Sequence, residues 1–200
     1  MRIPMLVAAF LILVSHGSAS ASDAIGTSQG QALGVTRGGV TSYRGIEYAR
    51  AGRWQAPGPG ASWEGERLFG DYGAIAPQGS GGSEDEHCLF LNVWKPETIA
   101  AGTRLPVMVW IHGGGFRAGS GAMDPEALVR RGVVVVSFNY RLGKLGFFDH
   151  ESWDAAAPRN FGMLDMVAAL RWVHQNIPAF GGDPGRVTIA GNSAGGMGVQ

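Results

Sequence analysis

Two runs of apolar residues, each about as long as one strand, constrain the fold most strongly. Residues 107–111 and 133–138 are almost continuously apolar and lack the alternation of a strand with one solvent face. Such runs are expected of strands that are buried on both faces, as in parallel sheets covered by helices. Between them, Asp124 and Pro125 mark the start of a helix and Gly132 its end. We therefore predict a strand, a helix and a second buried strand.

A second helix and a third strand follow in the sequence. Apolar residues recur at helical spacing over residues 161–177, and Pro178 stops the helix. Residues 187–190 then form another apolar run of strand length. This alternation predicts a parallel sheet with right-handed crossovers. We expect one face of this helix to carry Met163, Leu164, Val167, Leu170 and Val173.

The segment before these elements has a different character, because short β-type runs are separated by glycines. Residues 33–36 and 40–48 flank a Gly38-Gly39 turn, and residues 89–94 form a further run. We predict that these runs form antiparallel strands at the start of a larger sheet. The predicted fold class is therefore α/β, with a mostly parallel sheet and antiparallel N-terminal strands.

The first 21 residues have the three parts of a signal peptide. Arg2 gives a positive start, residues 6–14 are apolar, and residues 19–21 read A-S-A, a small-residue cleavage site. The apolar run is about half of the ~20 residues that span a bilayer. We predict that residues 1–21 are a signal peptide cleaved after Ala21, that no membrane span remains, and that the protein is secreted or periplasmic.

Charge and cysteine content exclude several functions. The chain has 16 basic and 16 acidic residues, and this balance predicts neither nucleic acid nor an anionic membrane as a partner. Histidine and cysteine show no metal-site spacing, so we expect no metal and no cofactor. Cys88 is the single cysteine. We interpret it as a small buried hydrophobic residue, while pairing with a cysteine beyond residue 200 stays open.

The third predicted strand runs directly into a candidate nucleophile. Residues 191–195 read G-N-S-A-G, which is a G-x-S-x-G motif placed between a strand and an expected helix. A sharp turn there would lift the Ser193 hydroxyl toward a substrate, and side chains at Gly191 and Gly195 would clash. An ordinary Gly-Ser loop is the alternative, but the strand before the motif favours Ser193 as a nucleophile.

A second glycine motif follows the first buried strand. Residues 112–116 read H-G-G-G-F, and we expect them to face the Ser193 motif, because both lie at the carboxyl ends of parallel strands. Backbone N–H groups of Gly114, Gly115 and Ala194 can approach the negative oxygen that forms when an ester is attacked. A phosphate-binding loop is the alternative, but no Gly-Lys-Ser/Thr follows the glycines.

These motifs, together with several others, resemble the type-B carboxylesterases of the α/β-hydrolase fold, a family that includes cholinesterases and the adhesion protein neuroligin. The resemblance covers most of the chain after residue 21. It is carried by ordered matches at residues 43–49, 53–59, 89–94, 113–115, 139–143, 145–147 and 168–184.

The resemblance implies a serine esterase mechanism. Ser193 corresponds to the acylated serine, and Gly114, Gly115 and Ala194 correspond to the oxyanion hole. A Glu or Asp and a His that follow the serine complete the triad in this family. None of residues 194–200 is Glu, Asp or His. We therefore expect residues 22–200 to be the N-terminal part of a catalytic domain, truncated after the nucleophile and nearly inactive alone.

The sequence departs from the family pattern near the active site. Asn192 stands where the family usually has Glu, so a negative charge beside the serine is missing. Residues 76–78 read A-P-Q where members commonly have C-P-Q, so Cys88 lacks its usual partner. No aromatic residue lies in residues 76–88, whereas cholinesterases have a tryptophan there that binds quaternary ammonium. We do not expect cholinesterase activity.

The leading hypothesis is therefore a carboxylic ester hydrolase that acts on a small-molecule ester through an acyl-serine intermediate. The alternatives are a non-catalytic, neuroligin-like binding module and an inactive fragment. Asp165 lies within the predicted helix, and we expect it to form a buried ion pair with Arg141 or Arg171 rather than to be the triad acid. The sequence leaves acyl and alcohol specificity and oligomeric state open.

Overall fold

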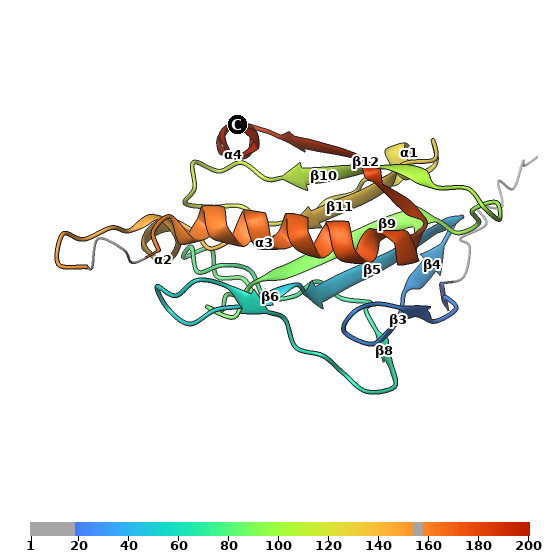
Figure 1. Cartoon of the computed structure of the whole chain (residues 1–200), viewed down its shortest axis with the longest axis horizontal. Coiled ribbons are helices and arrows are strands. Elements are labelled where there is room, and N and C mark those ends of the chain that lie inside the picture. The colour runs from blue at the N-terminus through green and yellow to red at the C-terminus, as the bar shows by residue number, and fades with distance from the viewer. Residues whose placement is uncertain (1–18, 154–157) are drawn as a thin grey trace, which may run out of the picture.

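The protein is built around a mixed seven-stranded sheet (Figure 1). The computed structural model describes residues 19–153 and 158–200. Strand β10 pairs in parallel with β11 and β12, and the remaining pairs of this sheet are antiparallel. The α/β fold with antiparallel N-terminal strands is therefore confirmed. In spatial order the strands are β1 (Ser20–Ala21), β4 (Val35–Arg37), β5 (Val40–Glu47), β9 (Phe90–Pro96), β11 (Val134–Phe138), β10 (Leu105–Ile111) and β12 (Gly182–Gly191).

Smaller elements complete the described chain. A three-stranded sheet contains β2 (Ile25–Gly26), β3 (Gln31–Leu33) and β8 (Glu66–Leu68), and a two-stranded sheet contains β6 (Ala49–Arg50) and β7 (Gly58–Pro59). The helices are α1 (Glu126–Val129), α2 (Gly143–Phe147), α3 (Phe161–Asn176), the 3-10 helix η1 (Ile177–Phe180) and α4 (Ala194–Val199).

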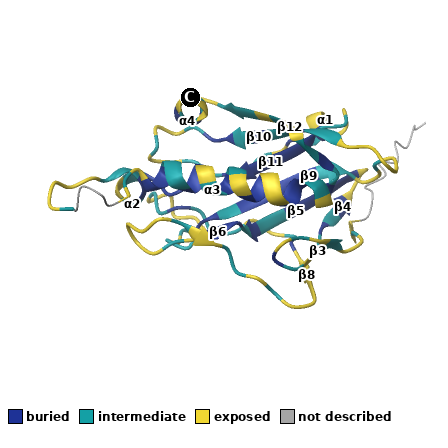
Figure 2. Ribbon diagram, in the orientation of Figure 1, coloured by how far each residue is buried: buried dark blue, intermediate teal, exposed yellow. Residues whose placement is uncertain are grey.

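The central strands are buried on both faces, as their continuous apolar sequences predict. On β11, Val134 and Val136 belong to the main core, which also contains residues of α3. Val135 belongs to a second cluster, which includes Val129 of α1. Figure 2 shows β11 and β9 largely buried, while β12 at the sheet edge is more accessible. The helices therefore cover opposite faces of the sheet.

The apolar residues predicted to share one face of α3 are buried to different degrees. Val173 is fully buried, Met163 and Leu170 are partly buried against the main core, and Val167 is 42% exposed. The buried face includes Asp165 and Asn176, which are polar, and Gly162 and Ala169, which are small. Polar and small residues do not contribute to an apolar pattern, so that pattern identified only part of the buried face.

The predicted signal peptide overlaps the described structure only at its end. Residues 1–18 lie outside the described residues, and Ser20 and Ala21 form β1, which pairs with Thr36 and Val35 of β4. Cleavage after Ala21 would remove this short edge strand. The signal peptide, its cleavage point and export all stay predictions. Within the described parts of the chain, no helix combines the length and the hydropathy needed to cross a membrane.

Candidate active site

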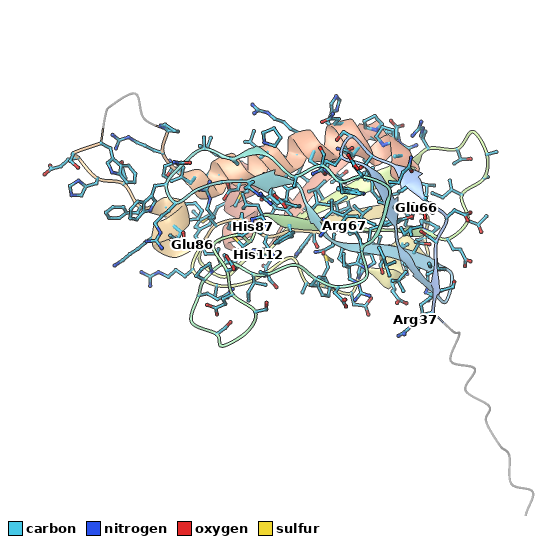
Figure 3. The ribbon with its side chains drawn as sticks, turned by 90° about the horizontal axis from the view of Figure 1, so that it is seen from below. Arg37, Glu66, Arg67, Glu86, His87 and His112 are labelled. Atoms are coloured by element: carbon cyan, nitrogen blue, oxygen red, sulfur yellow. The ribbon has the colours of Figure 1, made fainter. Side chains whose placement is uncertain are left out.

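The two glycine motifs begin at the same level of the sheet. Strand β10 ends at Ile111 and β12 at Gly191, and these residues are direct partners in the parallel ladder. The chain after Ile111 enters the H-G-G-G-F loop, which we call the glycine loop (residues 112–116), and the chain after Gly191 enters the turn to α4. Figure 1 shows both strands pointing toward the end of the molecule where α2 and α4 lie. Figure 3 shows His112 near the middle of the molecule and Arg37 of β4 at the end away from α2.

Ser193 occupies the tight turn between β12 and α4 with a backbone conformation that is rare for a residue with a side chain. Its φ is 53° and its ψ is −121°. A Cβ on Gly191 would overlap the carbonyl group of Gly195, and a Cβ on Gly195 would overlap the carbonyl oxygen of Ile111. The two motif glycines are therefore required by close backbone packing, as the sequence predicted. The turn has the geometry of a nucleophile elbow.

The glycine loop lies directly against this turn. A Cβ on Gly113 would lie 2.7 Å from the carbonyl oxygen of Asn192 and 3.2 Å from the Cβ of Ser193. The loop itself turns tightly, because the carbonyl oxygen of Gly114 accepts hydrogen bonds from the N–H groups of Arg117 (3.0 Å) and Ala118 (3.1 Å). The structure thus brings together the two motifs that the sequence predicted to face one another.

The backbone N–H groups of Gly114, Gly115 and Ala194 are the candidate donors of the oxyanion hole. Within residues 19–153 and 158–200, none of the three donates a hydrogen bond to another protein group. Gly114 and Gly115 have φ values of 110° and 62°, which L-residues adopt at a cost. Ala194 is the first residue of α4, so its N–H has no partner within the helix. Such free donors are the elements of an oxyanion hole.

Tyr140 supports the glycine loop and Gln78 binds Gly119 just after it, and the sequence analysis gave neither residue a role at the site. The Tyr140 hydroxyl donates to the carbonyl oxygen of His112 (2.8 Å), and its ring stacks on the His112 ring with centroids 4.3 Å apart. Burial raises the pKa of Tyr140 to about 12, so the hydroxyl remains a donor. Gln78 forms two hydrogen bonds with Gly119: its Nε2 donates to the carbonyl oxygen (3.1 Å), and its Oε1 accepts from the N–H (2.8 Å). The position of Tyr140, two residues after β11 at the carboxyl edge of the sheet, was the available signal.

His112 is engaged within the glycine loop. Its Nδ1 lies 2.8 Å from the carbonyl oxygen of Gly113, which can only accept, so Nδ1 carries the proton. Burial lowers the pKa of His112, so the ring is neutral near neutral pH. In the described part of the chain, its buried Nε2 has no hydrogen-bond partner. A neutral ring on Tyr140 supports the loop sterically without adding charge to it.

Asp165, His87 and Cys88 occupy positions that indicate structural rather than catalytic roles. Asp165 forms a buried ion pair with Arg141, one of the two partners expected: the Arg141 Nη2 donates to Asp165 Oδ1 (2.7 Å) and Nε donates to Oδ2 (2.8 Å). His87 lies 3.3 Å from the Glu47 carboxylate. Cys88 is fully buried, and burial raises the pKa of its thiol to about 12. A protonated buried thiol is a poor nucleophile.

The comparisons with known proteins point to one family. The family model described as "Carboxylesterase family" matches residues 19–200. The chain is 44% identical over 190 residues to the para-nitrobenzyl esterase of Bacillus subtilis (strain 168), and the match covers 86% of this chain and 38% of that esterase. It is 42% identical over 208 residues to a cocaine esterase of Oryctolagus cuniculus, with 90% of this chain and 39% of the relative covered.

Solved structures agree with these relatives. A structure titled "PNB ESTERASE" matches with a TM-score of 0.82 and 45% sequence identity over 88% of this chain and 39% of that chain. The fold is therefore the α/β-hydrolase fold, and the chain spans about two fifths of the length of the relatives cited here. Because the family model matches nearly the whole chain, this protein belongs to the carboxylesterase family.

Proposed function

We propose that the full-length protein hydrolyses carboxylic esters through an acyl-serine intermediate on Ser193. Family membership supports this proposal, and so does the strained turn that presents the Ser193 side chain beside Gly113. The proposal concerns the full-length protein, because the chain spans only 38% of the para-nitrobenzyl esterase that it matches. Small aryl or alkyl esters are the substrate class that we propose.

The first chemical step forms the acyl-enzyme. The Ser193 Oγ attacks the ester carbonyl carbon, and its proton passes to a histidine base, which by family resemblance follows Ser193 in the full-length protein. The carbonyl oxygen becomes negatively charged and is held by the N–H groups of Gly114, Gly115 and Ala194. The tetrahedral species then collapses, the bond to the alcohol oxygen breaks, and the histidine returns the proton to that oxygen.

The second step releases the acid. A water molecule loses a proton to the same histidine and attacks the acyl carbon, so that the oxyanion forms again at the same N–H groups. When this species collapses, the bond to the Ser193 Oγ breaks and the histidine protonates the serine. The products are one carboxylic acid and one alcohol, and the enzyme is restored.

The backbone conformation of Ser193 is the observation that carries the proposal. A residue with a side chain at positive φ costs about 1–3 kcal/mol and persists where the surrounding structure enforces it. Here the enforcing contacts are the close backbone packing at Gly191 and Gly195. A non-catalytic binding module needs neither a serine at this strained position nor free N–H groups beside it, so the geometry favours the enzyme.

The direct test is a burst experiment on the full-length protein. Rapid mixing with p-nitrophenyl acetate should release about one p-nitrophenol per protein before the steady state, because acylation is expected to precede a slower deacylation. Mass spectrometry of the quenched protein should then find the acetyl group on the peptide that contains Ser193. Acetyl found on another residue, or no hydrolysis of any ester, would count against the proposal.

Replacing Gly114 with alanine should damage the oxyanion hole without removing its N–H. The new Cβ would overlap the carbonyl oxygen of Ala118, so the loop must shift and carry the Gly114 N–H out of place. We expect kcat for p-nitrophenyl acetate to fall about 100-fold or more, as for loss of one oxyanion donor. The control is Gly102→Ala, which also places a side chain at a positive φ (77°) but meets no atom within 4 Å. Equal losses in the two variants would show that general strain, and not the oxyanion loop, is responsible.

A further inference from the structure

A pocket opens directly beside the candidate oxyanion hole. Its volume is about 520 Å³, which is in the range of small-molecule sites, ~300–1,000 Å³. Gly115 lines this pocket and also supplies one of the free N–H groups, so a substrate carbonyl held at Gly115 would direct one end of the substrate into the pocket. The side chains that line it are those of Phe116, Arg117, Lys144, Phe147 and Phe148.

Aromatic side chains form the walls of this pocket. The rings of Phe116 and Phe147 pack with centroids 4.7 Å apart, and the Phe148 ring lies 6.0 Å from that of Trp54. A backbone hydrogen bond joins the two segments that carry Phe116 and Phe147. The carbonyl oxygen of Phe116, a residue at φ 58°, accepts from the N–H of Gly143 (2.7 Å). The walls are therefore apolar surfaces, suited to the carbon chain or ring of a substrate.

Arg117 and Lys144 give the lining of this pocket two positive charges. Arg117 and Lys144 are both exposed, and among the residues that the structure describes neither forms an ion pair. By contrast, the exposed Arg53 is paired with Glu86. The described lining of the pocket contains no Asp or Glu, and Asn192 next to the nucleophile is neutral. Unbalanced positive charge at the mouth of a cleft attracts anionic substrates.

Hydrogen bonds from neighbouring segments of the same chain hold the backbone that carries Lys144. The Trp54 Nε1 donates to the carbonyl oxygen of Lys144 (3.0 Å), and Lys144 lies in α2, whose first residue bonds to Phe116. Arg117 follows Phe116 directly and donates its backbone N–H to Gly114. Both cations are therefore attached to segments that are themselves bonded to the glycine loop.

We infer that this pocket, the Arg117–Lys144 pocket, makes the enzyme prefer esters that carry a carboxylate a few carbons from the scissile bond. The inference deepens the proposed ester hydrolysis and rests on it. The aromatic walls would pack the carbons between the two groups, and Arg117 and Lys144 would bind the carboxylate with charge-assisted hydrogen bonds. The carboxylate can belong to the acyl half or to the alcohol half of the ester.

The test compares two matched substrate pairs on the full-length protein. The first pair is mono-p-nitrophenyl glutarate and p-nitrophenyl pentanoate, which have acyl chains of equal length and differ in a carboxylate on the acyl side. The rates are corrected for the spontaneous cyclisation of the glutarate ester. The second pair is 4-acetoxybenzoate and methyl 4-acetoxybenzoate, in which it lies on the alcohol side. We expect the charged member of one pair to have the higher kcat/KM, and the pair that shows the preference identifies the half of the ester in the pocket.

The variant Arg117→Gln/Lys144→Gln decides whether the pocket causes the preference. For the substrate pair that shows the preference, the double variant should lower the ratio of kcat/KM for the charged ester to that for the neutral ester about tenfold or more. A decrease of this size is expected when hydrogen bonds to a charged group are lost. The wild-type ratio should also decline with added salt. The matched control is Arg131→Gln, an exposed arginine just before the amino end of β11, away from the carboxyl edge, and it should leave the ratio unchanged.

The experiment distinguishes a failure of the pocket inference from a failure of the proposed function. Hydrolysis of the neutral esters with no preference for either charged ester overturns the pocket inference and leaves the proposed function intact. The pocket inference is also overturned if the double variant lowers kcat/KM equally for both members of a pair, because the side chains would then only support the loop. No hydrolysis of any of the four esters overturns the proposed function and the inference together.

Discussion

The Ser193→Ala variant of the full-length protein should lose nearly all hydrolysis of p-nitrophenyl acetate. Removing the nucleophile of a serine hydrolase lowers kcat by about 10⁴–10⁶-fold, because the remaining oxyanion donors cannot form the acyl-enzyme. The backbone should stay in place, since the close contacts at Gly191 and Gly195 enforce the turn independently of the serine hydroxyl. The measurement is steady-state kcat with the burst amplitude from the same reaction.

Ser83→Ala is the matched control for this experiment. Ser83 is exposed in the glycine-rich loop before Cys88, so its replacement should leave kcat and burst amplitude as in the wild type. Unchanged circular dichroism in both variants separates a lost nucleophile from a lost fold. If Ser193→Ala retained a full burst, another residue would be the nucleophile and the assignment of Ser193 would be wrong.

The Asp165→Ala variant should destabilise the full-length protein strongly. Asp165 is fully buried in α3 and bonds to Arg141 through both carboxylate oxygens, and its Oδ2 also accepts from the Arg141 backbone N–H (3.0 Å). Removing one partner leaves the other charge buried and unpaired, which costs about 3–5 kcal/mol. Arg141 also donates to the carbonyl oxygen of Gln55 (2.9 Å), so the loop that carries Trp54 should loosen as well. Denaturant unfolding monitored by fluorescence measures the change.

Two further variants show whether the buried charge is the cause. Glu126→Ala breaks an exposed pair with Arg130, and such pairs contribute less than about 1 kcal/mol, so it should unfold almost as the wild type does. The double variant Asp165→Leu/Arg141→Met removes both charges and should recover much of the stability lost in Asp165→Ala. If the double variant were as unstable as the sum of its single replacements, lost packing rather than an unpaired charge would explain the effect.

Local sequence patterns predicted the elements that depend mainly on local chemistry. The apolar runs located β10 and β11 to within two residues at each end, and Pro178 follows the end of α3 within two residues. The G-x-S-x-G motif placed Ser193 in the turn after β12, because only glycine fits where two backbone segments touch. The expected meeting of that turn with the glycine loop also followed from sequence, since parallel strands bring their carboxyl ends to one edge.

These local patterns could not predict hydrogen bonds between residues far apart in sequence. Tyr140 was part of a motif match, but its hydrogen bond to His112 exists only because β11 lies beside β10 in the sheet. The two hydrogen bonds between Gln78 and Gly119 join residues 41 positions apart in sequence. Such contacts depend on how segments distant in sequence pack together, so the local residue pattern of neither segment predicts them.

The sequence by itself determined the α/β class, the strained serine turn and the glycine loop. Tight backbone turns require glycine and strands buried on both faces require apolar residues, so both features can be recognised in the sequence. The tertiary structure alone decided which of the two expected arginines pairs with Asp165, because the Arg141 guanidinium lies within hydrogen-bonding distance of that carboxylate. It also decided that Arg117 and Lys144 share one pocket, since the N–H of Gly143 bonds to the carbonyl oxygen of Phe116 and brings α2 against the glycine loop. Charges 27 positions apart in sequence become neighbours only through that hydrogen bond and the packing around it.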